Sequence, residues 1–140
     1  MPRVRVTRRV HFSAAHRLAR EEWSEEENAR VFGACSNPNW HGHNYELDVT
    51  VEGEVDPETG YVMDLKLLKE RVHEVAVSDV DHRNLNLDVE WMEGVIPTTE
   101  NLVVRLWDRL EPEMPDGVRL ARLVLYETPR NYVEYEGSEP

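Results

Sequence analysis

The sequence predicts an α+β fold in which a four-stranded antiparallel sheet carries two helices on one face. The 140 residues fit a single domain, taken here as 1–140. Segments with strand or helix periodicity follow the order strand, strand, helix, helix, strand, strand, and this segregation is typical of α+β layers. The clearest strand has one apolar and one polar face. A long sheet with one wet face and open edges favours association, so we expect sheets to join into an oligomeric barrel.

Four segments carry the strand signal. Residues 41–53 alternate most regularly, and residues 3–12 place most of their apolar side chains on one parity. Residues 118–127 and 132–135 are rich in Val, Leu and Tyr and are separated by a turn. The apolar face of the clearest strand consists of Tyr45, Leu47, Val49 and Val51.

Two segments carry the helix signal. Asp64 is a good N-cap for a helix whose apolar residues recur at helical spacing as far as Ala76. Thr98 or Thr99 caps a second helix, which must end near Pro112.

The connection between the first two strands has two parts. Residues 20–28 form a charge run, which indicates either a solvated loop or a short surface helix. Residues 33–40 are dense in turn-forming residues and predict a loop.

Composition excludes several kinds of partner and compartment. There are 16 Lys and Arg residues against 28 Asp and Glu, giving a net charge of −12 that repels nucleic-acid backbones and anionic membranes. No apolar run approaches the ~18 residues of a membrane span. No secretory signal is visible and Cys35 is the lone cysteine, so we expect a cytoplasmic protein.

Three histidines are candidate metal ligands. His41 and His43 lie two residues apart on a strand, so their imidazoles leave the same face. His16 can join them if the first two strands pair as neighbours. Three imidazoles with one open position are typical of catalytic zinc, whereas structural zinc sites have four ligands, usually including cysteines. The alternative is that the His-Gly-His run is simply a polar strand start.

Four other residues have a chemical interpretation and a plain one. Cys35 is a proton-accepting thiolate near a metal, a fourth metal ligand, or an inert buried thiol. Asp81 and His82 cooperate only if they lie in a loop, where a carboxylate can orient an imidazole; otherwise they end a helix. Glu127 is a surface carboxylate or an acceptor of two parallel hydrogen bonds from an amidine-like edge.

The chain resembles the 6-pyruvoyl tetrahydropterin synthase family over residues 12–137. The resemblance is carried by several short motifs at residues 12–18, 37–45, 81–85, 98–101 and 126–128, together with the Asp-Pro-Glu-Thr-Gly turn at 56–60. It implies a ββααββ tunnelling-fold subunit whose sheets form trimeric barrels that stack as hexamers.

The resemblance also implies site roles. His16, His41 and His43 match the zinc ligands, one ion per subunit, and Cys35 matches the catalytic base. Asp81 and His82 match the rest of a catalytic triad, in a site that draws on more than one subunit. Glu127 matches the carboxylate that anchors the pterin, assisted by Thr98 and Thr99.

The implied reaction converts 7,8-dihydroneopterin triphosphate to 6-pyruvoyl tetrahydropterin with loss of triphosphate. It needs no nicotinamide or flavin, and Mg²⁺ is a further candidate cation on the triphosphate. One alternative is 6-carboxytetrahydropterin synthase of queuosine biosynthesis, which releases acetaldehyde and triphosphate. That branch typically has three residues between the cysteine and the His-Gly-His, whereas Ser36 to Trp40 supplies five here. The other alternative is a non-enzymatic, zinc-stabilised pterin-binding or structural protein.

Overall fold

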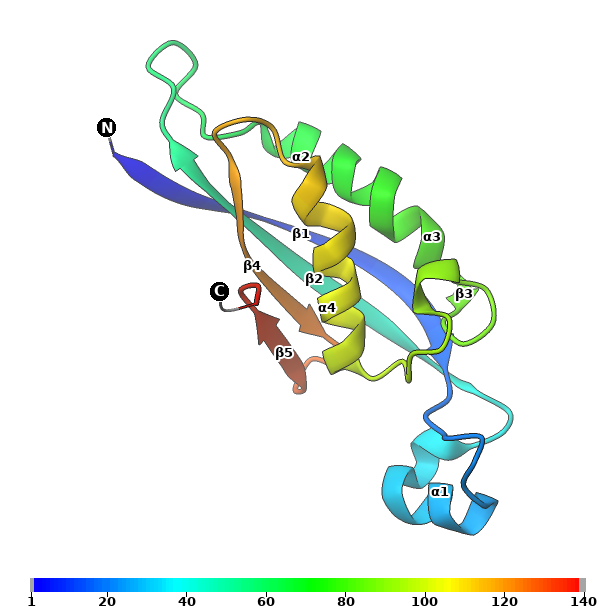
Figure 1. The fold of residues 1–140 in the computed structure, drawn as a ribbon. Helices are drawn as coiled ribbons and strands as arrows, with labels where there is room; N and C mark the ends of the chain where they lie inside the picture. Colours follow the sequence, from blue (N-terminus) through cyan, green and yellow to red (C-terminus); the bar gives the residue numbers. More distant parts are fainter. Residues whose placement is uncertain (1, 139–140) are drawn as a thin grey trace.

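The computed structural model describes residues 2–138 and confirms the α+β class. Figure 1 shows one long, twisted sheet with helices on it. The strands, from one edge to the other, run in the order β3-β1-β2-β4-β5. Their bounds are β1 Arg3–His16, β2 His41–Glu54, β3 Arg83–Asn84, β4 Arg119–Tyr126 and β5 Tyr132–Tyr135.

The predicted sheet is wrong in one respect, because it has five strands and is mixed. The strand that was not predicted is β3, which pairs in parallel with Ala14 and Ala15 of β1. A two-residue strand has no room for alternation, so periodicity could not reveal it. The first strand is also longer than predicted, since it continues past Phe12 to His16.

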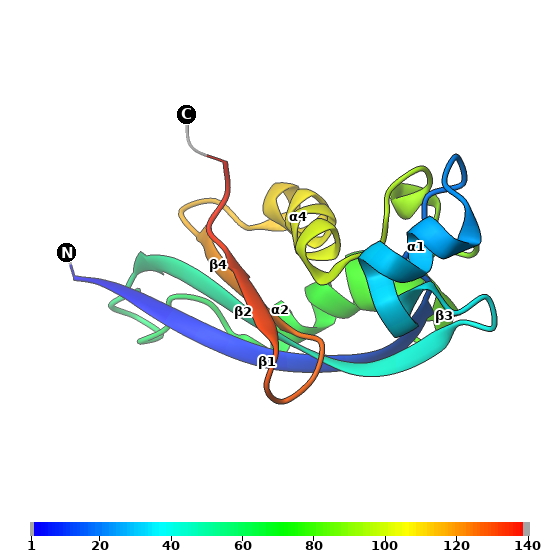
Figure 2. The ribbon, with the colours of Figure 1, turned by 90° about the horizontal axis from the view of Figure 1, so that it is seen from below.

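The helical layer covers one face of the sheet. The helix predicted after Asp64 is a continuous run made of α2 (Leu65–Val72), a π-helical turn (His73–Val77) and α3 (Ser78–Val80). The second predicted helix is α4 (Thr99–Leu110), and both runs lie on the same side of the sheet in Figure 2.

A third helix, α1 (Glu25–Phe32), lies beyond one end of the sheet, where the charge run allowed either a loop or a surface helix. Short 3-10 turns follow at Gly33–Ser36, Glu90–Met92 and Glu111–Glu113. Within residues 2–138, no helix combines the length and the apolar character needed to cross a bilayer.

The core lies between the sheet and the two helical runs. Alternate residues of β1 and β2 face the helices, and the inward side chains of β2 from Tyr45 to Val51 have no exposed surface. Burying each such side chain stabilises the fold by about 1.5–3 kcal/mol. On the opposite face β1 and β2 form ion pairs, including Arg9 with Asp48 at 2.7 Å.

The strand order brings three strand ends together. β1 and β2 pair without interruption from Arg3 opposite Glu54 to His16 opposite His41. β4 runs antiparallel to β2, with Tyr126 opposite Glu46, so Glu127 follows β4 beside the start of β2. The end of β1, the start of β2 and the end of β4 therefore share one end of the sheet.

Candidate metal and substrate site

Three imidazoles converge on the helix-covered face at this end of the sheet. His16 and His41 are direct cross-strand partners, and His43 lies opposite Ala14 on the same face. The Nε2 atoms of His16 and His41 are 3.0 Å apart. The three ring centroids are 4.6–5.0 Å apart, with interplanar angles of 69° and 84°. The register of β1 against β2 thus assembles the three histidines that the sequence singled out.

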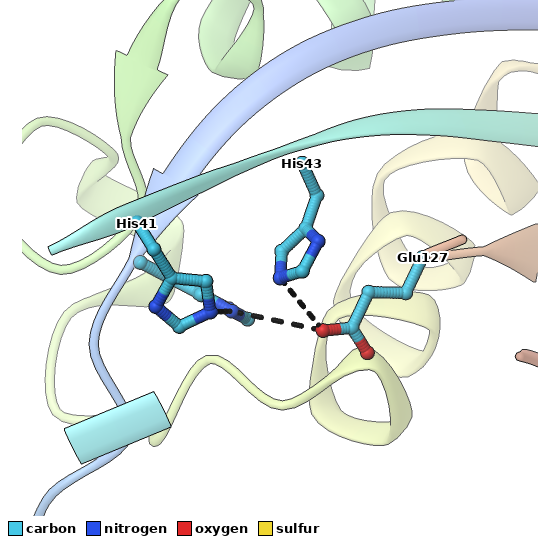
Figure 3. Close-up of side chains that lie close together, drawn as sticks. His41, His43 and Glu127 are labelled. Atoms are coloured by element: carbon cyan, nitrogen blue, oxygen red, sulfur yellow. Dashed lines mark hydrogen bonds and ion pairs between the residues drawn. The ribbon is translucent and has the colours of Figure 1, made fainter. Parts of the chain in front are cut away.

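Glu127 completes a cluster of four donor groups. One ligand atom from each of His16, His41, His43 and Glu127 lies within 4.8 Å of every other. The Oε1 atom of Glu127 is 2.9 Å from Nε2 of His43, a contact drawn as a dashed line in Figure 3, and 3.8 Å from Nε2 of His16. Its other oxygen, Oε2, accepts a 2.7 Å hydrogen bond from the hydroxyl of Thr99. The sequence indicates either a surface carboxylate or a pterin anchor at Glu127, and no pattern in it reveals that this residue lies beside the histidines.

The hydrogen bond from His16 to Pro97 sets which ring nitrogen of His16 carries the proton. A carbonyl oxygen can only accept, so the 2.8 Å contact between His16 Nδ1 and Pro97 O places a proton on Nδ1. His16 is buried, and burial is the main cause that lowers its pKa. Both observations favour the neutral ring with its proton on Nδ1, so that the lone pair of Nε2 is directed into the cluster. Metal-bound histidines typically donate their second N–H to a carbonyl in this way.

The other two histidines also suit a cation. Burial lowers the pKa of His43, which favours the neutral imidazole. Nε2 of His43 is buried and forms no hydrogen bond among the described residues, although Oε1 of Glu127 lies 2.9 Å away; Nδ1 of His41 is likewise buried without a hydrogen bond. A buried polar atom without a partner is costly, and a metal ion would satisfy the inward-facing one. The residues present therefore fit the zinc site that the sequence predicts.

Cys35 lies in the 3-10 turn after α1, close to the cluster but outside it. Its carbonyl accepts a 2.7 Å hydrogen bond from Leu18 N, which ties this turn to the end of β1. Among residues 2–138, the donor cluster contains Glu127 and not Cys35, so the fourth-ligand alternative for Cys35 is not supported. Burial, and then the charge of Glu127, raises the pKa of the Cys35 thiol. These protein groups alone oppose the thiolate; a cation in the cluster would favour it.

Asp81 and His82 contact each other at the end of α3. Asp81 Oδ1 lies 3.0 Å from Nδ1 of His82 and accepts a 2.9 Å hydrogen bond from Ser13 N. The backbone N–H of His82 donates to Ser13 O at 2.6 Å, with His82 held at a φ of 60°. A left-handed conformation at a residue other than glycine is uncommon and is found at functional sites.

The Asp81 and His82 pair does not join the cluster. The His82 side chain is 82% exposed, and no hydrogen bond or ion pair within the described residues connects it to the three histidines or to Glu127. It lines an open groove together with Ser13, Ala14, Asn44 and Arg83, and this groove reaches His43. Asp81 has a lowered pKa, first because of the Ser13 N–H and then because of His82. An ionised Asp81 is therefore positioned to hold the imidazole of His82.

The fold and the site define an α+β protein with a histidine and carboxylate metal-site candidate at one end of its sheet. The family model described as "6-pyruvoyl tetrahydropterin synthase" matches residues 5–138. A Pongo abelii protein named "6-pyruvoyl tetrahydrobiopterin synthase" is 51% identical over 132 residues, covering 94% of this chain and 90% of that protein. A Homo sapiens protein of the same name is 49% identical with the same coverage.

A solved structure supports the same assignment. Caenorhabditis elegans 6-pyruvoyl tetrahydropterin synthase superposes with a TM-score of 0.91 at 43% identity, covering 99% of this chain and 98% of that one. The chain belongs to the 6-pyruvoyl tetrahydropterin synthase family.

Proposed function

We propose that this chain is a zinc-dependent lyase that converts 7,8-dihydroneopterin triphosphate to 6-pyruvoyl tetrahydropterin with elimination of triphosphate. The observation that carries the proposal is the convergence of three imidazoles and one carboxylate at one end of the sheet, in a member of this family. The names of the similar proteins from Pongo abelii and Homo sapiens support the same activity.

His16, His41 and His43 are the proposed zinc ligands, with one ion per subunit. Three neutral imidazoles leave one coordination position open for substrate. Zinc bound there supplies a Lewis acid that withdraws electron density from side-chain oxygens of the substrate and makes the neighbouring C–H bonds more acidic. Mg²⁺ is the proposed companion of the triphosphate, and the proposed reaction uses no nicotinamide or flavin.

Glu127 is the proposed anchor for the pterin ring. An ionised carboxylate can accept two parallel hydrogen bonds from the amidine-like edge of such a ring. Thr99 fixes the orientation of Glu127 through its hydrogen bond to Oε2. Thr98 contributes as the N-cap of α4, where its hydroxyl accepts from Asn101 N at 3.1 Å and holds the start of the helix that carries Thr99.

Cys35 and His82 are the proposed proton-transfer groups. The Cys35 thiolate would remove a proton from the substrate side chain, and His82 would return one on the other face. Asp81 accepts from Nδ1 of His82 and so leaves Nε2 to carry the exchanged proton. The net result is an internal redox change by tautomerisation, with triphosphate as the leaving group.

The proposed assembly is a hexamer, a dimer of trimers, in which sheets join as a barrel. Two features support it. The exposed His82 is available to a site on a second copy. Over residues 2–138, only Ala14 and Ala15 of β1 pair with β3. Most of the outer edge of β1 is therefore open to another strand. The lone cysteine favours the cytoplasm as the proposed compartment.

The product distinguishes this proposal from the carboxy-forming alternative. Five residues separate Cys35 from His41, and this spacing favours pyruvoyl formation. The test is to give zinc-loaded protein 7,8-dihydroneopterin triphosphate and to measure triphosphate, the pterin product and acetaldehyde. We expect triphosphate and 6-pyruvoyl tetrahydropterin without acetaldehyde; stoichiometric acetaldehyde would assign the carboxy-forming reaction. If zinc removal unfolds the chain and no turnover is found with zinc, the non-enzymatic alternative stands.

A further inference from the structure

Residues 96–99 contact both a proposed zinc ligand and the proposed pterin anchor. Pro97 O accepts from His16 Nδ1 at 2.8 Å, and two residues later Thr99 Oγ1 donates to Glu127 Oε2 at 2.7 Å. The proposed zinc ligand and the proposed pterin anchor therefore depend on the same stretch of chain, residues 96–99. A shift of this stretch would move the partner of His16 and the partner of Glu127 together.

The side chain of Asn101 closes the turn that shapes this stretch. Its amide Nδ2 donates to Ile96 O at 2.9 Å, while its backbone N–H donates to the hydroxyl of Thr98 at 3.1 Å. Ile96 O also accepts from Thr98 N at 2.8 Å. Asn101 thus spans the segment from the first turn of α4 back to the residue before Pro97, and the two contacts to the site lie inside the loop that it closes.

Pro97 restricts the backbone conformations that residues 96–99 can adopt if the side-chain amide of Asn101 is removed. A residue that precedes proline is disfavoured in the helical region, so Ile96 cannot simply extend α4 backwards by another turn. Neither Ile96 nor Pro97 belongs to the helix, which begins at Thr99. The carbonyl direction of Pro97 is therefore set by the few hydrogen bonds that surround it. Among the described residues, two side chains donate to the backbone of this stretch: His16 donates to Pro97 O and Asn101 donates to Ile96 O.

We infer that Asn101 is a positioning residue for both zinc and pterin, acting through residues 96–99. It touches neither the histidines nor Glu127 by any hydrogen bond in the described chain. Its effect is to fix the carbonyl that orients His16 and the hydroxyl that orients Glu127. The inference rests on the proposed function, because it assigns Asn101 a role toward the proposed zinc and pterin sites.

The rival explanation is that Asn101 only stabilises the start of α4. The variant Asn101→Asp separates the two, because a carboxylate has almost the same shape and suits the positive end of a helix, but it cannot donate to Ile96 O. A helix-stabilising role predicts no loss in this variant, whereas a positioning role predicts loss. Glu100→Gln is the matched control: Glu100 is an exposed neighbour whose side chain makes no hydrogen bond or ion pair within the described residues.

The experiment measures zinc affinity by chelator competition, KM and kcat with the pterin triphosphate, and thermal unfolding of the zinc-free protein. Groups that hydrogen-bond to metal-bound histidines typically contribute 10- to 100-fold to metal affinity. Asn101 holds the segment that carries such a partner and is not itself one, so its loss is expected to weaken zinc binding by about three- to tenfold. For Asn101→Asp we expect this loss in zinc affinity, a rise of similar size in KM, and an unchanged unfolding midpoint. Glu100→Gln should match the unsubstituted protein in all of these measurements.

Unchanged zinc affinity and KM in Asn101→Asp would overturn the inference, as would an equal effect in Glu100→Gln. If Asn101→Asp does not fold, Asn101→Ala removes the donor without adding a charge and must weaken zinc binding and raise KM in the same way. If the unsubstituted protein binds no zinc, the proposed function fails. The NMR signal of the His16 Nδ1 proton in metal-free protein then still tests the inference, since this proton must exchange faster in Asn101→Asp.

Discussion

Replacing Glu127 with glutamine asks whether this carboxylate anchors the pterin or ligates the metal. Its Oε1 is 2.9 Å from His43 Nε2 and its Oε2 accepts from Thr99, so both roles are sterically open. Glutamine keeps the shape and one acceptor oxygen but loses the charge and turns the other acceptor into a donor. An amidine-like edge that donates two hydrogen bonds would meet one acceptor and one opposing donor.

The size of the effect follows from the bonds that change. A hydrogen bond to a charged group contributes about 1.5–3 kcal/mol, and roughly 1.4 kcal/mol is a factor of ten in affinity. We therefore expect the KM of Glu127→Gln to rise about 10- to 150-fold. If three histidines suffice for zinc, its affinity should change by less than about tenfold, since Glu127 then lies outside the set of ligands.

The same variant has a second readout at Cys35. The charge of Glu127 helps to raise the pKa of the Cys35 thiol, so removing that charge must lower the pKa. The rate of alkylation of Cys35 in metal-free protein should then reach its half-maximum at a lower pH in Glu127→Gln. Glu100→Gln removes a charge from an exposed position of the first turn of α4 and serves as the control.

Two results would refute this reasoning. An unchanged KM combined with a collapse of zinc binding would place Glu127 among the metal ligands. An alkylation profile of Cys35 that does not move would mean that the thiol does not sense the carboxylate. The measurements are independent, so each idea can fail without the other.

Three further outcomes are expected. His43→Ala should lose most of the bound zinc, as measured by metal analysis after dialysis, because it removes one of three ligands; undiminished zinc would contradict the site. Cys35→Ala should keep its circular dichroism and zinc content and lose turnover, and retained turnover would exclude Cys35 as the base. In zinc-free protein, burial lowers the pKa values of His16 and His43 in the folded state, so the unfolded state binds more protons as pH falls. Stability should therefore be fully present above about pH 6.5 and decline below it, and a denaturation midpoint independent of pH between about 7 and 5 would contradict this.

Local patterns predicted most of the elements. The alternation from Tyr45 to Val51 predicted β2 and its buried face, and the caps at Asp64 and Thr98 predicted where two helices begin. Side-chain parity placed His41 and His43 on one face. These features depend on neighbours within a few residues, which is the range over which strand and helix periodicities act.

The features that sequence reasoning missed depend on distant pairings. β3 exists because Arg83 and Asn84 meet the end of β1, and two residues carry no periodic signal. The closeness of Glu127 to His43 depends on the register of β4 against β2, which includes an irregularity between Thr50 and Val51. The bond between His16 and Pro97 joins residues 81 positions apart. A spatial contact of this kind leaves no pattern in a single sequence.

Because β1 and β2 pair without interruption, the proposed metal site can form only in chains whose two strands are in the correct register. His16 meets His41 only when all the pairs from Arg3 and Glu54 onward are in register. A slip by one residue would turn the His16 side chain to the opposite face of the sheet, and a slip by two would move it about 7 Å along the neighbouring strand. Misregistered chains would lack a third imidazole at the right place and would stay empty. With zinc in the proposed site, zinc content per chain would therefore count correctly paired molecules, and a preparation could be sorted by its metal before any substrate is added.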